Sequence, residues 1–116
     1  MIQGIFYSGD QFFRFYTDGT FLDCLIRKAS SADFDNISTW FTRESKLGGI
    51  VRGQYEMDGK RITFKTVGHF GDGVRTVNYT GTYSKSGLTL DSLDHNTGHR
   101  TSSIAYRPFA GGSKAE

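Results

Sequence analysis

The sequence predicts an all-β fold: a small antiparallel meander β-barrel of about eight strands, with one short helix at about 33–43 inserted after the third strand. Three observations lead to this prediction. The 116 residues include 15 Gly, 10 Phe and 6 Tyr, and aromatic residues suit a pleated surface while glycines suit turns and barrel bends. The Asp-Gly dipeptides at 18–19 and 58–59 lie between strand-like stretches, as in hairpins. Eight such stretches follow one another, mostly through short turns, and a meander of this length solves its edge problem best by closing.

The first strand is expected at about 2–7, and a hairpin follows around the Asp-Gly at 18–19. Asp-Gly supplies the positive φ angles that a two-residue type I′ turn requires. Such a turn pairs Arg14 with Asp23 across the two strands. A three-residue loop would instead place Asp23 opposite Phe13, so the side-chain pattern favours the two-residue register.

Both faces of this hairpin are rich in apolar residues, whereas a half-solvated hairpin would alternate apolar and polar ones. The inner face is expected to carry Phe13, Phe15, Leu22, Cys24 and Ile26, and the outer face Phe12, Tyr16, Phe21 and Leu25. Exposure of the outer set would forgo about 1.5–3 kcal/mol for each large side chain. We therefore predict burial on both faces, with the outer face covered by the 33–43 helix or by a second subunit.

The helix prediction depends on a periodic apolar stripe. Ser31 or Asp33 can cap its start, and Phe34, Ile37, Trp40 and Phe41 recur at helical spacing. The stripe could form a lid over the barrel mouth or dock on the outer wall. Amphipathic stripes usually face a core, so docking is preferred.

The second Asp-Gly turn, at 58–59, joins two strands that alternate in the ordinary way. A two-residue loop places Tyr55 opposite Ile62 and Glu56 opposite Arg61. The predicted inner face is Val51, Gly53, Tyr55, Ile62 and Phe64, and the polar outer face is Arg52, Gln54, Glu56, Arg61, Thr63 and Lys65.

The remaining elements are a glycine-rich loop at 68–73 and strands at about 74–83, 87–93 and 100–107. The loop lacks the Gly-Lys-Ser/Thr and the following helix of a phosphate-binding loop. We expect one barrel domain over 1–109 and a disordered tail at 110–116.

Charge and cysteine content exclude several classes of protein. The net charge is +2 and the 14 Lys/Arg are scattered, so no basic footprint for nucleic acid is present. No leader opens the chain and no apolar run approaches the ~20 residues of a membrane helix. The single Cys24 excludes an intrachain disulfide. We expect a cytoplasmic protein without nucleic-acid or membrane partners.

The eight-stranded layout resembles the lipocalin-like (calycin) barrels. Gly4-Ile5-Phe6 is similar to the Gly-x-Trp motif of their first strand, and Arg107 stands where such barrels pack a cation across that aromatic residue. Phe6 replaces the tryptophan, Trp40 lies in the predicted helix, and the chain is shorter than is usual for the group. The resemblance covers about residues 2–107 and implies a cup for a small apolar molecule.

The residues predicted to line a ligand site are inward aromatics: Phe13, Phe15, Tyr55, Tyr79, Tyr83 and Tyr106. Buried phenols need hydrogen-bond partners, and several of them converging could line a partly polar pocket of at least ~300 Å³. Their rings could equally fill the core. His69, His95 and His99 show no recognised metal spacing, and turn composition explains them as well as a loop metal site with Asp94 does.

The leading hypothesis is a non-catalytic barrel that binds a small apolar or aromatic ligand, without cofactor, metal or catalytic residues. One alternative is a cyclase or isomerase that uses the same cup, with a Tyr or His as general acid. Another is an interaction module that dimerises through Phe12, Tyr16, Phe21 and Leu25.

Overall fold

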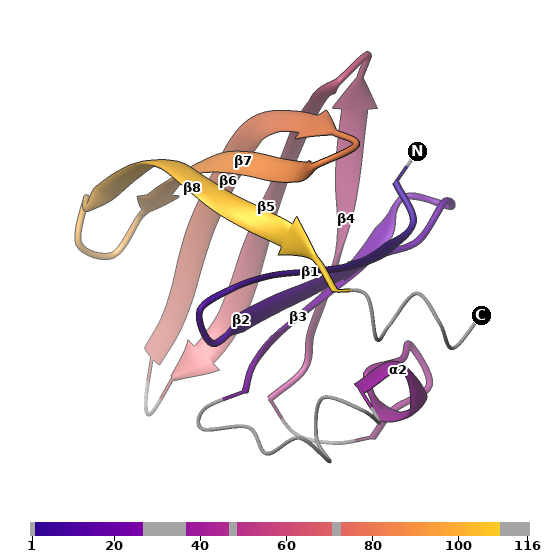
Figure 1. Cartoon of the computed structure of the whole chain (residues 1–116). Coiled ribbons are helices and arrows are strands. Elements are labelled where there is room, and N and C mark those ends of the chain that lie inside the picture. The colour runs from indigo at the N-terminus through magenta and orange to yellow at the C-terminus, as the bar shows by residue number, and fades with distance from the viewer. Residues whose placement is uncertain (1, 27–36, 47–48, 71–72, 110–116) are drawn as a thin grey trace.

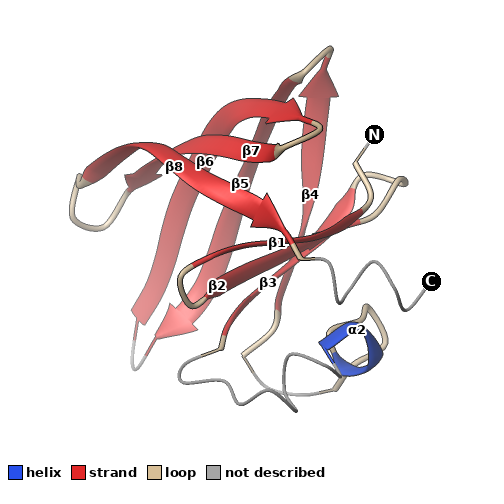
Figure 2. Cartoon of the chain, in the orientation of Figure 1, coloured by secondary structure: helices blue, strands red, loops and turns tan. Residues whose placement is uncertain are grey.

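The computed structural model describes residues 2–26, 37–46, 49–70 and 73–109 of the chain (Figure 1). Eight antiparallel strands form a closed barrel in which each strand pairs with the next along the sequence and the last pairs with the first (Figure 2). In chain order the elements are β1 (Gly4–Ser8), β2 (Gln11–Phe15), β3 (Thr20–Leu25), α2 (Ile37–Trp40), β4 (Val51–Asp58), β5 (Arg61–Phe70), β6 (Gly73–Ser84), β7 (Gly87–Asp94) and β8 (Arg100–Pro108). The predicted fold class is confirmed.

The β2–β3 hairpin has a different register from the predicted one. Phe13 lies opposite Asp23 and Phe15 opposite Phe21, because the loop has three residues, 17–19, instead of two. The Tyr16 N–H donates to the Thr20 carbonyl at 2.9 Å, and Gly19 takes a φ of +92° that favours glycine. The hairpin thus has the three-residue loop, and the prediction of a two-residue loop is wrong.

The register difference reverses the two faces of β3, because successive side chains of a strand alternate. Phe21 points into the barrel core, whereas Leu22 and Cys24 belong to a cluster outside the barrel. Ile26, also predicted to face inward, packs against the same outer cluster. The faces of β2 are as predicted, with Phe13 and Phe15 inside and Phe12 outside.

The predicted Arg14–Asp23 pair is therefore wrong. Asp23 faces the interior, and the Arg14 guanidinium donates to the Phe41 carbonyl at 2.8 Å on the outside. Arg14 also lies 5.3 Å from the centre of the Tyr16 ring. The guanidinium thus ties the end of the α2 segment to the barrel wall.

The outer cluster (Ile5, Phe12, Leu22, Cys24, Ile37 and Phe41) confirms that the first hairpin is buried on both faces. Its cover comes from the same chain: Ile37 in α2 and Phe41 directly after it, both fully buried. Of the predicted helix, residues 33–36 lie outside the described residues, and 41–43 follow the helical turn without extending it. Phe12 and Phe21 are fully buried within the chain, and Leu25, predicted on the outer face, shares the inner face of β3 with Phe21. From the predicted dimer set only Tyr16 therefore remains on the outer face for contact with a second copy.

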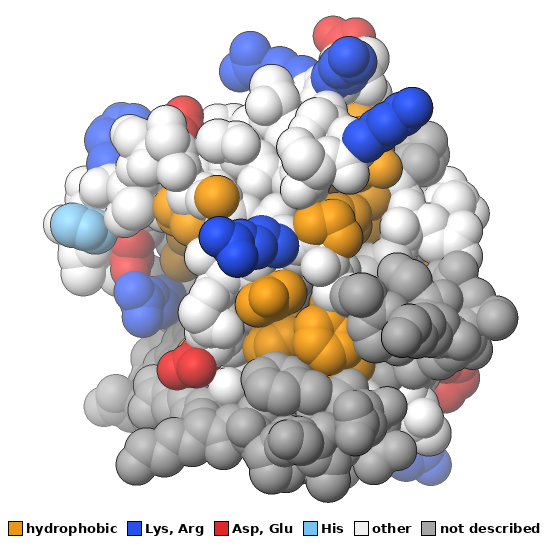
Figure 3. Space-filling view, viewed as in Figure 1, with side chains coloured by type: hydrophobic (Ala, Val, Ile, Leu, Met, Phe, Trp, Pro, Cys, Tyr) orange, Lys and Arg blue, Asp and Glu red, His pale blue; other side chains and the backbone are white. Residues whose placement is uncertain are grey.

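The face seen in Figure 3 carries apolar side chains near β1 and β8 with a basic side chain among them. Tyr7 of β1 stacks on Phe12 with ring centres 5.5 Å apart, and Phe109 packs edge-on against both. Arg107 lies opposite Tyr7 and is exposed, while Phe6 points into the core. Arg107 and Phe6 therefore lie on opposite faces of the sheet. The prediction that Arg107 packs across the Phe6 ring is wrong.

The β4–β5 hairpin turns at Gly59-Lys60, which places Asp58 opposite Arg61 and Tyr55 opposite Phe64. Its register differs from the predicted one by two residues, so every side chain keeps its predicted face. Tyr55, Ile62 and Phe64 are buried, and the six polar outer residues are exposed.

The predicted loop at 68–73 is shorter in the structure. β5 continues to Phe70 and β6 begins at Gly73, with His69 opposite Val74; residues 71–72 lie outside the described residues. Gly81 of β6 allows a close crossing, because a Cβ there would come within 1.9 Å of the Thr89 carbonyl oxygen. The predicted tail at 110–116 also lies outside the described residues.

The interior of the barrel is filled at one end by an aromatic cluster. Phe13 lies at its centre, with ring centres of five neighbours 5.2–6.3 Å away: Phe15, Phe21, Phe64, Tyr79 and Tyr106. Ile2 and Tyr55 complete this end, where the Tyr55 hydroxyl donates to the Tyr16 carbonyl at 2.6 Å and accepts the Ile2 N–H at 3.0 Å. The barrel is thus packed at this end, and its open space lies at the other.

Candidate functional site

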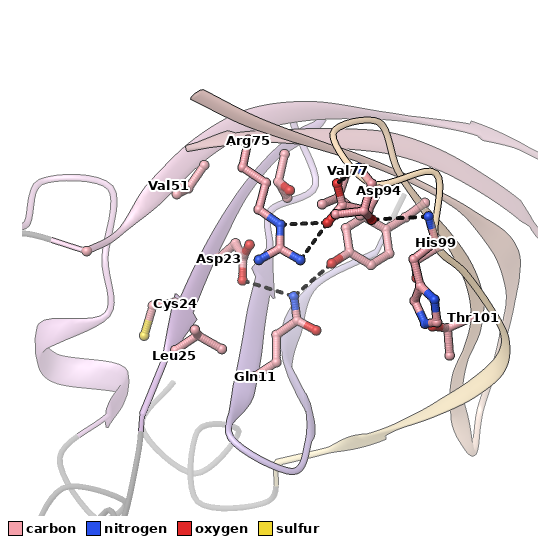
Figure 4. A pocket seen from close by; sticks show the side chains of 15 residues that line it. Gln11, Asp23, Cys24, Leu25, Val51, Arg75, Val77, Asp94, His99 and Thr101 are labelled. Atoms are coloured by element: carbon pink, nitrogen blue, oxygen red, sulfur yellow. Dashed lines mark hydrogen bonds and ion pairs between the residues drawn. The ribbon is translucent and has the colours of Figure 1, made fainter. Parts of the chain in front are cut away.

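A cavity of about 680 Å³ occupies the end of the barrel away from Tyr55. Its walls come from β2, β3 and the start of β4 on one side and from β5, β6, β7 and β8 on the other (Figure 4). Leu25, Val51 and Val77 give it an apolar surface. Gln11, Asp23, Thr66, Arg75, Tyr79 and Asp94 add polar groups. The volume falls within the ~300–1,000 Å³ range of small-molecule sites.

The six residues predicted to line a site divide between the cavity and the packed cluster. Tyr79 lines the cavity. Phe13, Phe15, Tyr55 and Tyr106 are buried among other rings, and Tyr83 packs against the same cluster. The predicted aromatic set therefore forms the filled part of the barrel, and Tyr79 stands at the boundary between the two parts.

Asp23 is the residue that the sequence prediction placed on the wrong side of the wall. Its half-buried side chain reaches into the cavity, where Gln11 Nε2 donates to Asp23 Oδ1 at a long 3.4 Å (Figure 4). Burial raises the pKa of Asp23 to about 6, and the Gln11 hydrogen bond offsets only part of this effect. The carboxyl group is thus anionic at pH 7 but takes up a proton in mildly acidic solution.

Gln11 connects Asp23 to two phenols: Tyr79, which lines the cavity, and Tyr106, which belongs to the packed cluster beneath it. Its Nε2 donates to the Tyr79 hydroxyl at 3.0 Å, and its Oε1 accepts the Tyr106 hydroxyl proton at 2.5 Å. Burial raises the pKa of both Tyr79 and Tyr106 above the ordinary value, so both phenols stay neutral. Because Tyr106 requires Oε1 as its acceptor, the amide nitrogen of Gln11 is directed toward Asp23 and Tyr79.

An ion pair stands beside Asp23 at the mouth of the cavity. The Arg75 Nε and Nη2 atoms lie 2.7 Å and 2.5 Å, respectively, from Asp94 Oδ2. Burial acts to raise the pKa of Asp94, but the Arg75 hydrogen bond and the N–H groups of Asn96 and Thr97 outweigh it, so the pKa is lowered. Asp94 is therefore a charged, well-partnered group that also organises the β7–β8 turn.

Cys24 and His99 also border the cavity, but neither belongs to the hydrogen-bonded group of Gln11, Asp23 and Tyr79. His95 and His99 are exposed, with His99 at the cavity rim, and the His69 side chain lies outside the described residues. Burial raises the pKa of the Cys24 thiol to about 12, with a contribution from the Asp23 charge, so Cys24 is an unreactive member of the outer cluster. Across 2–26, 37–46, 49–70 and 73–109, no three His, Cys, Asp or Glu residues are grouped to hold a metal.

Within the same ranges, no helix has the length and apolar character needed to cross a membrane.

Two features of the sequence could have revealed the site. Gly53 is opposite Phe21, whose ring fills the space where a Gly53 Cβ would stand, at 2.7 Å. A glycine on the inner face of β4 thus indicates a large inward neighbour on β3. Phe21 inward implies Asp23 inward, because the two are separated by one residue.

Comparisons of the chain with protein-family models, with curated proteins and with solved structures gave no significant match.

Proposed function

We propose that this small β-barrel binds a small organic molecule with a substantial apolar part in the cavity at its open end. The observation that carries the proposal is the combination of a cavity of about 680 Å³ with apolar walls and a few convergent polar groups. A barrel whose only task was to be stable would gain by filling this space with side chains, as it does around Phe13.

The ligand would rest on the aromatic cluster and project toward the rim. Tyr79 stacks on Phe64 with ring centres 5.0 Å apart, which holds its ring in place as part of a rigid floor. Val51 and Val77 would contact the apolar part of the ligand from opposite walls. Gln11 and Asp23 would then select its polar part.

Binding is favoured over the cyclase or isomerase alternative by the surroundings of Asp23. Asp23 does supply the inward titratable group that such an enzyme needs. Its hydrogen-bond partner in the described part of the chain is, however, the neutral amide of Gln11, and the guanidinium of the cavity, Arg75, is paired with Asp94. A carboxyl group whose direct partner is a neutral amide fits recognition better than acid–base catalysis.

Narrowing the cavity should weaken ligand binding. We expect the neutral fluorophore N-phenyl-1-naphthylamine to bind the wild type with a rise in fluorescence, and Val77→Phe to weaken that binding at least tenfold. The added ring would occupy cavity space from the β6 wall. Fluorescence titration at a fixed pH checks this expectation.

Val67→Phe is the matched control. Val67 lies on neighbouring β5 and is exposed on the outer face, so the same substitution there should leave the affinity unchanged. Equal affinity of wild type and Val77→Phe, or no fluorescence response of the wild type, would contradict the proposed function.

A further inference from the structure

We propose that the ligand class is organic cations, namely protonated amines with an apolar body, and that Asp23 is the counter-ion. This inference rests on the proposed function and specifies what the same cavity selects. It follows from the charges, the hydrogen bonds and the wall around Asp23.

The charges of the cavity leave one negative group without an ionic partner. Its lining contains two carboxylates, Asp23 and Asp94, and one guanidinium, Arg75. Arg75 is paired with Asp94 through two nitrogens. Asp23 forms no ion pair in the described part of the chain, so the cavity presents a net negative charge at pH 7.

The other groups that face Asp23 do not neutralise it. From β2 comes the Gln11 amide, from β6 the Tyr79 phenol and from β8 the Tyr106 phenol, both with raised pKa values. The Cys24 thiol belongs to the outer face of β3, and His99 stands at the exposed rim. Among the residues that the structure describes, none supplies a cation that balances Asp23, and a bound cation would fill that role.

Hydrogen bonding to the half-buried Asp23 carboxylate is also sparse within the described part of the chain. Its bond from Gln11 is 3.4 Å long, and the same Gln11 nitrogen makes a shorter bond of 3.0 Å to Tyr79. Buried charged groups are ordinarily paired and fully hydrogen-bonded. An ammonium group in the cavity would supply short, charge-assisted donors to this carboxylate.

The walls beside Asp23 suit the apolar remainder of such an amine. Val51 lies directly opposite Asp23 on β4, and Leu25 follows on the same face of β3. The Tyr79 ring adds an aromatic surface of the kind that favours cations. An anionic ligand would meet Asp23 as a like charge, so the cavity discriminates by charge as well as by shape.

A matched ligand series tests this selection by isothermal titration calorimetry at pH 7.5: 1-naphthylmethylamine, 1-naphthalenemethanol and 1-naphthoate. These ligands share one ring system and differ in charge. We expect the amine to bind at least tenfold more tightly than the alcohol, and the carboxylate to bind most weakly. At pH 5, where Asp23 is protonated, the advantage of the amine over the alcohol should largely disappear.

Asp23→Asn should weaken binding of the amine at least tenfold and binding of the alcohol much less, so that the preference for the amine is lost. Asp58→Asn is the control for net charge, since Asp58 is exposed beside the β4–β5 turn at the packed end, and it should change neither affinity. Equal binding of amine and alcohol, or an Asp23→Asn variant that still prefers the amine, would overturn the inference and leave the proposed function standing. Failure of all three ligands, together with N-phenyl-1-naphthylamine, would overturn both.

Discussion

Phe13→Ala is expected to lower the free energy of unfolding by about 3–5 kcal/mol, the usual cost of removing a buried phenyl ring. Phe13 is fully buried and lies at the centre of the aromatic cluster, within 6.3 Å of five other rings. These rings project from different strands of a closed barrel, so none can move far to fill the vacated space. The part of the destabilisation that comes from the empty space left by the ring should therefore be close to its maximum.

Chemical denaturation of the two proteins, with fluorescence and far-UV circular dichroism as probes, measures this difference. Phe109→Ala serves as the comparison, because Phe109 is half-buried at the edge of the outer cluster. This variant should lose clearly less free energy of unfolding than Phe13→Ala. A loss below about 1.5 kcal/mol for Phe13→Ala would mean that the interior is loosely packed, contrary to the cluster described above.

Asp23→Asn is expected to stabilise the protein at pH 7.5 by about 3 kcal/mol. The pKa of Asp23 is raised from 3.8 to about 6 in the folded state, a difference of 2.2 units at 1.36 kcal/mol for each unit. The folded state thus binds this proton more tightly than the unfolded state. The resulting contribution to stability is complete below pH 3.8 and is lost as the pH rises through 6.

Urea unfolding of wild type and Asp23→Asn at several pH values between 3.5 and 7.5 tests the expected pH dependence. The two proteins should have similar stability at the acidic end, and a difference should open between pH 4 and pH 6 and then level off. Taking the difference between variants removes the contributions of other titrating groups such as Asp94. A difference that does not vary with pH would mean that the Asp23 carboxyl is not buried.

The raised pKa implies that the Asp23 carboxylate lowers the stability of the folded protein at neutral pH, a feature typical of residues kept for function. Buried groups with perturbed pKa values gather at binding and catalytic sites, and stability is commonly lower there than the fold would allow. Asn at position 23 would have the same shape as Asp and could still accept the hydrogen bond from Gln11, without the loss of stability that comes from burying a charge. The stability cost of Asp23 thus agrees with its proposed role as counter-ion.

The architecture could be predicted because it depends on patterns that are local in the chain. Alternating strands and short turns determine an antiparallel meander, and the apolar character of both faces of the first hairpin predicted its cover. Ile37 and Phe41 supply that cover from the expected segment. None of these predictions required knowledge of which distant residues contact one another.

The Asp-Gly sequence alone does not determine the register of the first hairpin, because two loop lengths agree with it; the signal that distinguishes them lies on the next strand, at Gly53. The two-residue loop was preferred for the Arg14–Asp23 pair that it would form. In the structure Arg14 finds the carbonyl of Phe41, far along the chain, and a strand-pairing pattern carries no information about such a partner. One residue of shift then moved Asp23 from the surface to the cavity.

The position of the cavity could not be predicted from the sequence either. Which end of a small barrel is filled depends on how side chains from several strands meet, and the inward aromatics Phe13, Phe15 and Tyr55 all gather at one end. Tyr79 alone among the predicted lining residues borders the space that they leave. Prediction of inward-facing residues was thus possible, but prediction of the hollow region was not.

The β2–β3 register places the Asp23 carboxyl inside the cavity, and the proposed ligand class depends on this placement. Titration of that carboxyl carbon by NMR, assigned with the Asp23→Asn variant, measures its surroundings. The structure predicts a pKa of about 6. A value near the ~3.9 of an aspartate in water would place Asp23 on the outside of the barrel and contradict both the register and the ligand class proposed from it.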